Sequence, residues 1–114
     1  MIRETLAAAD TLAAEGVSAE VVDVATLKPL DTDGLLQSVA KTGRCLIVHE
    51  APLTGGFGAE IAARIAERGL VSLLAPIERV AGWDTVIPLP RLEQHYLPSE
   101  ARILAGVRRV LAYQ

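Results

Sequence analysis

The sequence predicts an α/β fold, a three-layer α/β/α arrangement in which helices cover both faces of a small, mainly parallel sheet. Helix-like and strand-like stretches alternate along the 114 residues, which is the pattern of parallel strands joined by helices. The strand-like run at 46–48 (LIV) is apolar at every position, as in strands buried on both faces. Because this length suits one modest core, residues 1–114 are expected to form a single domain.

A helix is expected to begin the chain, and a strand to follow it. The helix is predicted by apolar residues at helical spacing and by a glycine stop at position 16; its inward stripe is Ile2, Leu6, Ala9 and Ala13. Residues 18–24 (SAEVVDV) form a short β-branched run, which is typical of a strand.

A second helix and a second strand are expected next. Asp31 or Thr32 can cap the helix, which should stop before Gly43. Its inward residues are predicted to be Leu35, Leu36, Val39 and Ala40. Residues 45–50 (CLIVHE) are the next strand, which we expect to end at about His49.

The last part of the chain predicts a helix, a strand, an extended connection and a final helix. The helix at 58–68 should bury Ile61, Ala62, Ile65 and Ala66. A strand lies within 75–82, and prolines 88, 90 and 98 mark the connection. Ser99 opens the final helix, whose inward residues are predicted to be Ile103, Leu104, Val107 and Leu111.

Two features of this pattern indicate a fragment of a longer chain. Three strands make a small sheet for a fold of this class. In addition, the first helix has no strand before it, although an amphipathic helix in such a fold usually follows the strand it covers. We therefore expect the strand that this helix would cover to be missing.

Composition excludes several classes of function. The net charge is −3, and no basic stripe is present to bind nucleic acid. No apolar stretch approaches the ~20 residues of a membrane span, and the charged N-terminus is unlike a signal peptide. The single Cys45 fits a reducing compartment. We expect a cytoplasmic module whose partners are proteins or small molecules.

The stretch 45–65 (CLIVHEAPLTGGFGAEIAARI) is the candidate site, because His49 and Glu50 fall at the C-terminal end of a strand, where ligands bind in open α/β sheets. A dinucleotide fingerprint is not matched, since Ile61 occupies the third glycine position, and no lysine follows to make a P-loop. Glycines 55, 56 and 58 are predicted to form a tight turn. The N–H groups of the following helix remain a secondary option for an anion.

No catalytic or metal-binding residue is assigned. The serines lack a nucleophile elbow, and the spacing of His49, His95 and Cys45 fits no zinc pattern. Glu50 has no second carboxylate beside it in the sequence. His49 is interpreted as a structural imidazole bonded to loop backbone, and Trp83 as an anchor in a core or an interface.

Four stretches together resemble a known family: AEVVDVATLKPLD, LIVHEAPLTGGFGAEIAARIAE, APIERVAGWDTVIPLP and YLPSEARILAGVRRVL. They resemble the C-terminal domain of the beta subunit of thiamine-diphosphate-dependent 2-oxo acid dehydrogenases, within the broader transketolase C-terminal family. The resemblance implies a fold that carries two strands before the first helix, so we expect the family's first two strands to be missing from this chain. The signature is His49, Glu50, Gly55, Gly56 and Gly58. The motif HEAPLTGGF is similar to the corresponding stretch of branched-chain enzymes, which are of the 3-methyl-2-oxobutanoate dehydrogenase type.

The resemblance implies a parent enzyme that decarboxylates a 2-oxo acid on thiamine diphosphate with magnesium and passes the acyl group to a lipoyl arm. It implies that the alpha subunit and the preceding beta domain hold the cofactor, so this chain alone should bind none and catalyse nothing. The implied partners are the alpha subunit, a second beta subunit and the subunit-binding domain of the dihydrolipoyl acyltransferase. In isolation a homo-oligomer is expected.

The resemblance also points to interface candidates, namely Trp83, Asp84, Tyr96 and Gln114. One position departs from the family, because Leu74 stands where relatives often carry an acid that docks the acyltransferase. Two alternatives stay open: the C-terminal domain of another transketolase-like enzyme, and a free-standing α/β module that binds an anion or a small molecule.

Overall fold

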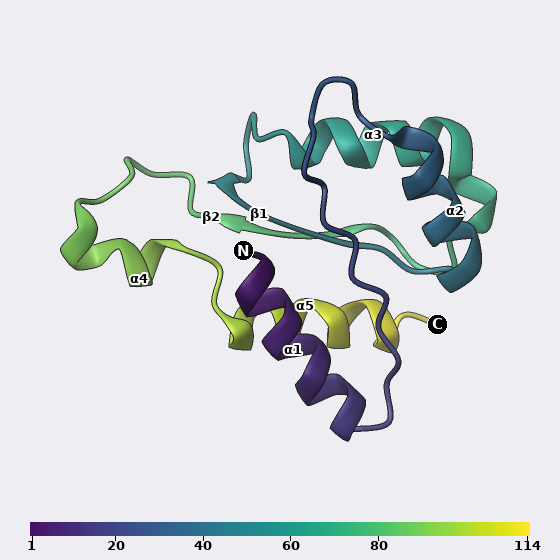
Figure 1. Cartoon of the computed structure of the whole chain (residues 1–114), viewed down its shortest axis with the longest axis horizontal. Coiled ribbons are helices and arrows are strands. Elements are labelled where there is room, and N and C mark those ends of the chain that lie inside the picture. Colours follow the sequence, from purple (N-terminus) through teal and green to yellow (C-terminus); the bar gives the residue numbers. More distant parts are fainter.

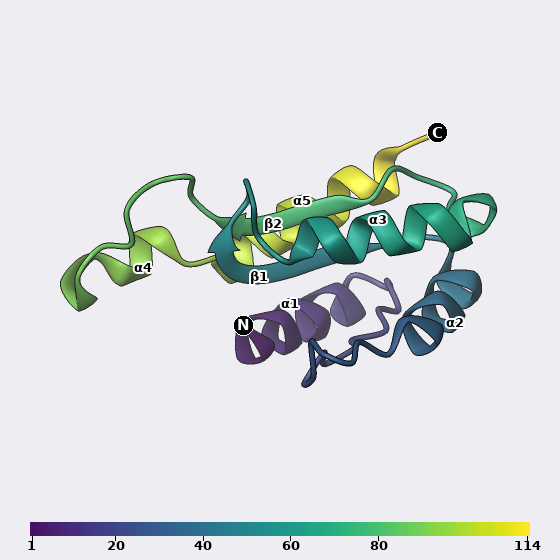
Figure 2. The same ribbon diagram turned by 90° about the horizontal axis from the view of Figure 1, so that it is seen from above.

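The structure, a computed structural model, describes all 114 residues as two parallel strands between two layers of helices (Figures 1 and 2). The elements in chain order are α1 (Ile2–Ala14), α2 (Thr32–Thr42), β1 (Leu46–Pro52), α3 (Gly58–Gly69), the 3₁₀ turn η1 (Leu70–Ser72), β2 (Glu78–Gly82), the 3₁₀ turn η2 (Pro90–Leu92), α4 (Glu93–Tyr96) and α5 (Glu100–Ala112). The predicted α/β class is confirmed, and no helix is long and apolar enough to cross a membrane.

The core has two parts, one on each face of the sheet. On one face, the helices α2 and α3 pack with β1 through Val39, Ile47, Ile61 and Ile65. On the other face, α1 and α5 pack with β2 through Ala8, Val80 and Ile103. Since both faces are covered, β1 begins with an uninterrupted apolar run, LIV.

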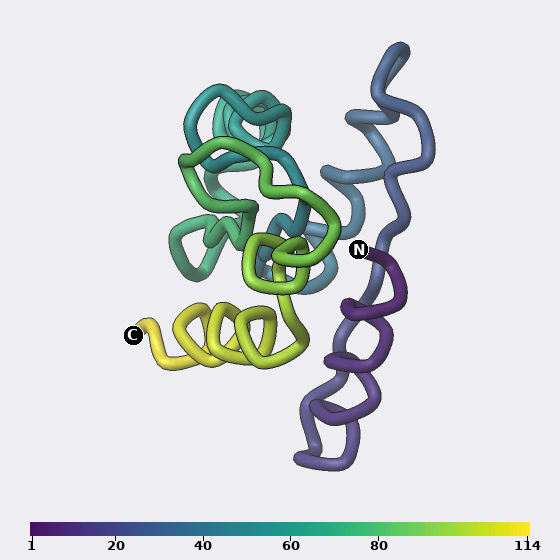
Figure 3. The backbone as a smooth tube through the Cα atoms, turned by 90° about the vertical axis from the view of Figure 1, so that its left-hand side faces the viewer, coloured from purple at the N-terminus to yellow at the C-terminus, as the bar shows by residue number.

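The strand predicted at 18–24 does not form, so the sheet has two strands and not three. These residues form a coil that leads from the end of α1 back toward α2 (Figures 1 and 3). No backbone hydrogen bond joins residues 18–29 to β1 or β2. A β-branched run becomes a strand only when a neighbouring strand accepts hydrogen bonds from its N–H groups and donates to its C=O groups, and here no such bonds are made.

Of the two remaining strands, only β1 departs from its predicted bounds. β1 pairs in parallel with β2 in the register Leu46↔Glu78 and Val48↔Val80. After an irregularity, Pro52 pairs with Gly82, so β1 continues beyond the expected end at His49. β2 lies within the predicted range 75–82, as expected. A bulge of this kind lets a strand change direction before a loop.

The inward face predicted for α1 is wrong. Ile2 is 40% exposed and Leu6 is 49% exposed, whereas Ala8 and Leu12 are buried. The small side chain of Ala8 lets α1 approach Val80 and Ile103 closely, and Thr11 Oγ1 donates a hydrogen bond to Glu100 Oε1 of α5 at 2.9 Å. The helix therefore turns the face that carries Ala8 and Leu12 inward and leaves Ile2 and Leu6 outside.

The predicted ends of the other helices are confirmed. Asp31 accepts a hydrogen bond from the Gly34 N–H at 2.9 Å, Gly43 ends α2 with a φ of 71°, and Ser99 Oγ accepts from the Arg102 N–H at 3.3 Å. The predicted inward residues Ile61, Ile65 and Ile103 are buried. Three others are exposed, namely Ala40, Ala66 and Leu111. Val110 is buried in place of Leu111 because it lies on the same face of α5 as Ile103 and Gly106.

The connection from β2 to α5 projects from the body of the protein (Figures 1 and 2). It was predicted to be extended throughout, but η2 and α4 interrupt it. Its apolar side chains are open to solvent, with Val86 88% exposed, Leu89 81% exposed and Ile87 66% exposed. We call residues 83–97 the arm.

Candidate functional site at the carboxyl ends of the strands

The glycine loop, residues 53–57, joins β1 to α3 at the carboxyl ends of the strands. Gly55 has a φ of +74°, a left-handed conformation that side chains disfavour. A Cβ at Gly56 would lie 2.2 Å from the Pro52 carbonyl oxygen, and a Cβ at Gly58 would lie 2.3 Å from His49 Nε2. The predicted tight turn is therefore confirmed. Gly55 adopts a backbone conformation that favours glycine, and Gly56 and Gly58 leave no room for a side chain.

His49 lies within β1, under the glycine loop, with a partly buried side chain. Neither ring nitrogen has a hydrogen-bond partner, so the expected bond to loop backbone is not formed. Burial lowers the pKa of His49 below its ordinary value, and the positive charge of Arg79 adds to this effect. The Ala51 backbone acts in the opposite direction and raises the pKa of His49, although its placement does not meet the geometry of a hydrogen bond.

The lowered pKa of His49 predicts that stability falls as the pH falls. The unfolded chain takes up the proton near pH 6.5, whereas the folded chain takes it up only at lower pH. Between these two values the unfolded state binds more protons, so acidification favours unfolding. We expect the Tm to decrease from pH 7.5 to pH 5.5, and this decrease to shrink in the His49→Gln variant.

The chain offers a matched control for this measurement. His95 is exposed on α4, so the His95→Gln variant should keep the full pH dependence of the wild type. If the His49→Gln and wild-type curves have the same slope, the titrating group is not His49. The pKa of Asp84 is lowered from a value already near 3.8, so Asp84 titrates outside this range.

Glu50 points away from the core and is exposed. Its Oε1 lies 3.4 Å from the Met1 amine. No group of three or more His, Cys, Asp or Glu side chains is placed to hold a metal ion. The Cys45 thiol is no better suited to chemistry, because burial raises its pKa to about 11 and keeps it protonated at neutral pH.

Two residues beyond the predicted signature hold the glycine loop in place. Asp84 accepts hydrogen bonds from Thr54 at both carboxylate oxygens, from the N–H at 2.9 Å and from Oγ1 at 2.6 Å. These bonds hold the pKa of Asp84 below its usual value. Arg79 Nη1 donates to the Leu53 carbonyl oxygen at 3.1 Å. The loop is therefore tied to β2 and to the residues just after it.

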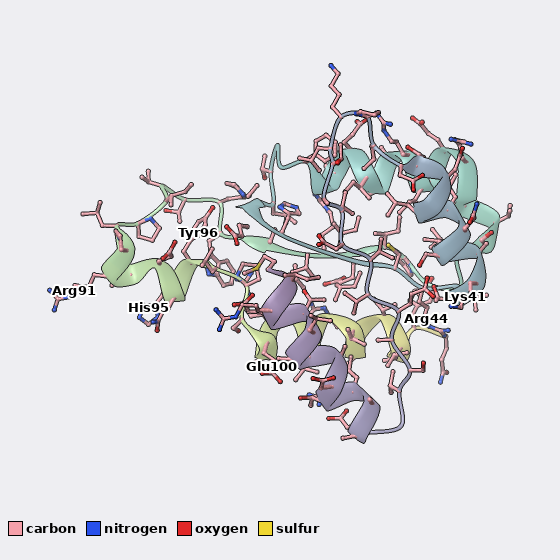
Figure 4. All side chains as sticks on the ribbon, viewed as in Figure 1. Lys41, Arg44, Arg91, His95, Tyr96 and Glu100 are labelled. Carbon is pink, nitrogen blue, oxygen red and sulfur yellow. The ribbon has the colours of Figure 1, made fainter.

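The remaining interface candidates take different positions. Trp83 is 54% exposed; its ring lies 4.2 Å from Arg102 Cζ, and its Nε1 donates to the His95 carbonyl oxygen at 3.0 Å. Tyr96 turns inward from α4, whereas Arg91 and His95 point outward (Figure 4). Tyr96 is only 4% exposed. Gln114 is exposed after α5, so the site brings Asp84 to the loop but leaves Gln114 apart from it.

Comparison with protein-family models identifies the family to which this chain belongs. The family model described as "Transketolase, C-terminal domain" matches residues 1–103. The chain belongs to the transketolase C-terminal domain family. The resemblance predicted from the four stretches is thus confirmed.

Relatives of this transketolase C-terminal domain are beta subunits. The chain is 45% identical over 113 residues to the pyruvate dehydrogenase E1 component subunit beta of Bacillus subtilis, covering 99% of this chain and 35% of that one. It is 52% identical over 99 residues to the mitochondrial 2-oxoisovalerate dehydrogenase subunit beta 2 of Arabidopsis thaliana, covering 87% and 27%.

A solved structure shares the fold. It is described as a split-gene transketolase, an inactive beta4 tetramer, and it superposes with a TM-score of 0.82 at 31% identity. The superposition covers 97% of this chain and 35% of that chain. The domain therefore spans about a third of the length of the Bacillus relative and of this structure.

Proposed function

We propose that this domain is the C-terminal, assembly-forming part of a 2-oxo acid dehydrogenase beta subunit and has no catalytic activity alone. The observation that carries the proposal is the match of 99% of the chain to such a beta subunit. The absence of a paired general acid and base around His49 and Glu50 is consistent with a role in assembly. The parent enzyme would decarboxylate a 2-oxo acid and transfer the acyl group to a lipoyl arm.

We propose a branched-chain 2-oxo acid as the substrate of the parent enzyme. The 52% identity to the Arabidopsis 2-oxoisovalerate enzyme over 99 residues supports this choice, as does the HEAPLTGGF motif. The Bacillus pyruvate enzyme matches over a longer stretch, 113 residues, at 45% identity. The full beta subunit, co-expressed with its alpha subunit, should turn over 3-methyl-2-oxobutanoate faster than pyruvate. A preference for pyruvate would contradict the substrate while leaving the family role intact.

Thiamine diphosphate and magnesium are proposed to bind elsewhere in the parent enzyme, in the alpha subunit and the preceding beta domain. The site described above offers no cluster of acidic side chains for the metal. Calorimetric titration of the 114-residue chain with thiamine diphosphate and magnesium should give only heats of dilution. Micromolar binding would contradict the assembly role. The chain's melting curve in the same buffer would confirm that the protein is folded.

Association with a second copy is the proposed role of the arm. Its exposed side chains Val86, Ile87 and Leu89 form an apolar surface, and contiguous surfaces of this kind usually mark interfaces. The fold relative described as a beta4 tetramer supports self-association of such chains. We expect light scattering at micromolar concentration to give at least a dimer, and the Ile87→Asp variant to shift it toward monomer.

The control for this measurement is Val71→Asp, because Val71 is 97% exposed on η1, outside the arm. It should leave the oligomeric state unchanged. A strictly monomeric wild type with a cooperative melt would contradict self-association and would show that the two-stranded sheet is sufficient by itself.

The subunit-binding domain of the acyltransferase is a further proposed partner. An apolar groove of about 640 Å³ lies at the opposite end of the sheet from the glycine loop, and its walls include Leu70, Leu74 and Tyr113. Leu74 is 62% exposed there. Where relatives place an acid, this chain therefore offers an apolar contact, so docking would depend less on salt concentration than it does with an acidic residue.

The alternative of a transketolase-like parent is favoured only by the split-gene transketolase structure, at 31% identity. A transketolase acts on sugar phosphates, so the substrate assay described above separates the two. Activity with neither 2-oxo acid but with a ketose phosphate would support this alternative.

A further inference from the structure

A hollow of about 480 Å³ lies beside β2, on the side away from β1. Three arginines line it, Arg79 from β2 and Arg102 and Arg109 from α5, together with Trp83 and Asp84. Three guanidinium groups in one hollow are unexpected in a chain whose net charge is −3. The hollow reaches the carboxyl end of β2, which is where parallel sheets commonly bind ligands.

Only one of the three arginines has a carboxylate partner. Arg109 Nε lies 2.8 Å from Glu78 Oε1 and is neutralised by it. Arg79 and Arg102 donate only to backbone carbonyl oxygens, those of Leu53 at 3.1 Å and Ala81 at 2.6 Å. Two positive charges therefore remain without a counter-charge in contact.

The one carboxylate on the wall is already engaged. Both oxygens of Asp84 accept hydrogen bonds from Thr54, and no ion pair joins Asp84 to Arg79 or Arg102. Asp84 thus fixes the glycine loop. Its charge acts on Arg79 from a distance, but it makes no direct ion pair with Arg79 or Arg102 and leaves their N–H donors without a carboxylate acceptor.

Arg102 also carries a donor without an acceptor. Its Nη1 is buried and has no hydrogen-bond partner, while its Nη2 binds the Ala81 carbonyl oxygen. A buried donor of this kind costs free energy until an acceptor is supplied. The half-exposed Trp83 ring covers the guanidinium, with its centre 4.2 Å from Arg102 Cζ. Movement of this ring would open the donor to the hollow.

We propose that the hollow is a binding site for a small oxyanion, the phosphate or carboxylate group of a small molecule, held between Arg79 and Arg102. A guanidinium group presents paired N–H donors that match two oxygens of either anion. The anion would supply both the counter-charge and the acceptor that Arg102 lacks. The proposal does not rest on the proposed role in assembly, although Trp83 and Asp84 of the wall are also the first residues of the arm.

Trp83 makes the proposal testable, because it is the only tryptophan of the chain and lies on the wall of the hollow. The 114-residue chain is titrated with sodium phosphate and, separately, with sodium acetate, with sodium chloride keeping the ionic strength constant. Tryptophan fluorescence and calorimetry are recorded together. We expect saturable binding of at least one anion. The anion with the higher affinity shows whether the site prefers a phosphate or a carboxylate group.

Variants locate the binding. Arg79→Gln and Arg102→Gln should each weaken binding about tenfold, the effect of losing a charge-assisted hydrogen bond. Arg108→Gln is the matched control, since Arg108 also lies on α5 but pairs with Glu15 outside the hollow. It should bind the anion as the wild type does.

Three results would overturn the proposal. The first is a folded wild-type chain that shows no saturable heat or fluorescence change with either anion. The second is an equal loss of affinity in Arg108→Gln and Arg79→Gln, which would indicate a general charge effect. The third is wild-type affinity in Arg79→Gln and Arg102→Gln. If Arg102→Gln does not fold, the comparison of Arg79→Gln with Arg108→Gln decides.

Discussion

Substitution of Gly56 by valine is expected to lower the free energy of unfolding by about 3 kcal/mol or more, the upper range for overpacked sites. A Cβ at this position would lie 2.2 Å from the Pro52 carbonyl oxygen and 2.7 Å from His49 Cε1. The Pro52 oxygen is backbone at the end of β1 and cannot rotate away. Relief of the clash would therefore have to bend the strand or lift the start of α3.

Denaturant titration measures this effect, and Gly55→Ala is its matched control. Gly55 has a φ of +74° but open space around its Cα, with nothing within 4 Å of an added Cβ. Alanine there costs only the left-handed strain of about 1 kcal/mol. Equal stability of Gly56→Val and the wild type would mean that the glycine loop rearranges freely and that its glycines meet no steric demand.

The sequence predicted the helices well because their signals are local. The cap at Asp31, the left-handed Gly43 and the cap at Ser99 each act within a few residues of the helix they bound. The prediction of the buried faces was less accurate where alanine alternates with larger residues. In α1, spacing alone favoured Ile2 and Leu6, but packing against α5 selected Ala8 and Leu12.

The false strand at 18–24 shows where local signals stop. Its β-branched residues make a strand favourable, but strand formation depends on a partner that is distant in the sequence. β1 pairs only with β2, and residues 18–29 make no backbone hydrogen bond to either strand. The composition of the segment contains no information about this absent neighbour.

The candidate site was predicted in part for the same reason. His49 and the glycines lie close together in the sequence, within residues 49–58, at the end of one strand and the start of the next helix, so a tight turn there could be predicted. The bonds from Thr54 to Asp84 and from Arg79 to the Leu53 carbonyl span 30 and 26 residues. Only the parallel pairing of β1 with β2 brings these groups together. The alternation of strand and helix was the one signal that could have suggested it.

Truncation of Tyr96 is expected to be the second most damaging change. The Tyr96→Ala variant should lose about 3 kcal/mol, the cost of removing a large buried ring. The ring is 4% exposed and packs directly on Gly82, where an added Cβ would lie 2.6 Å from its Cζ and Oη atoms. It is the buried contact that fastens α4 to the end of β2, so its loss should also release the arm and raise the rate of proteolysis within residues 83–97.

Tyr96→Phe separates the ring from its hydroxyl group and is expected to change stability in the opposite direction. The Tyr96 hydroxyl is buried without a hydrogen-bond partner, and such a group costs about 1 kcal/mol or more. Phenylalanine keeps the packing on Gly82 and removes that cost, so the free energy of unfolding should rise by up to about 1 kcal/mol. Urea titration of the wild type and both variants tests the pair. A Tyr96→Phe variant less stable than the wild type would show that the hydroxyl has an acceptor, and the arm would then be held by a hydrogen bond as well as by apolar contact.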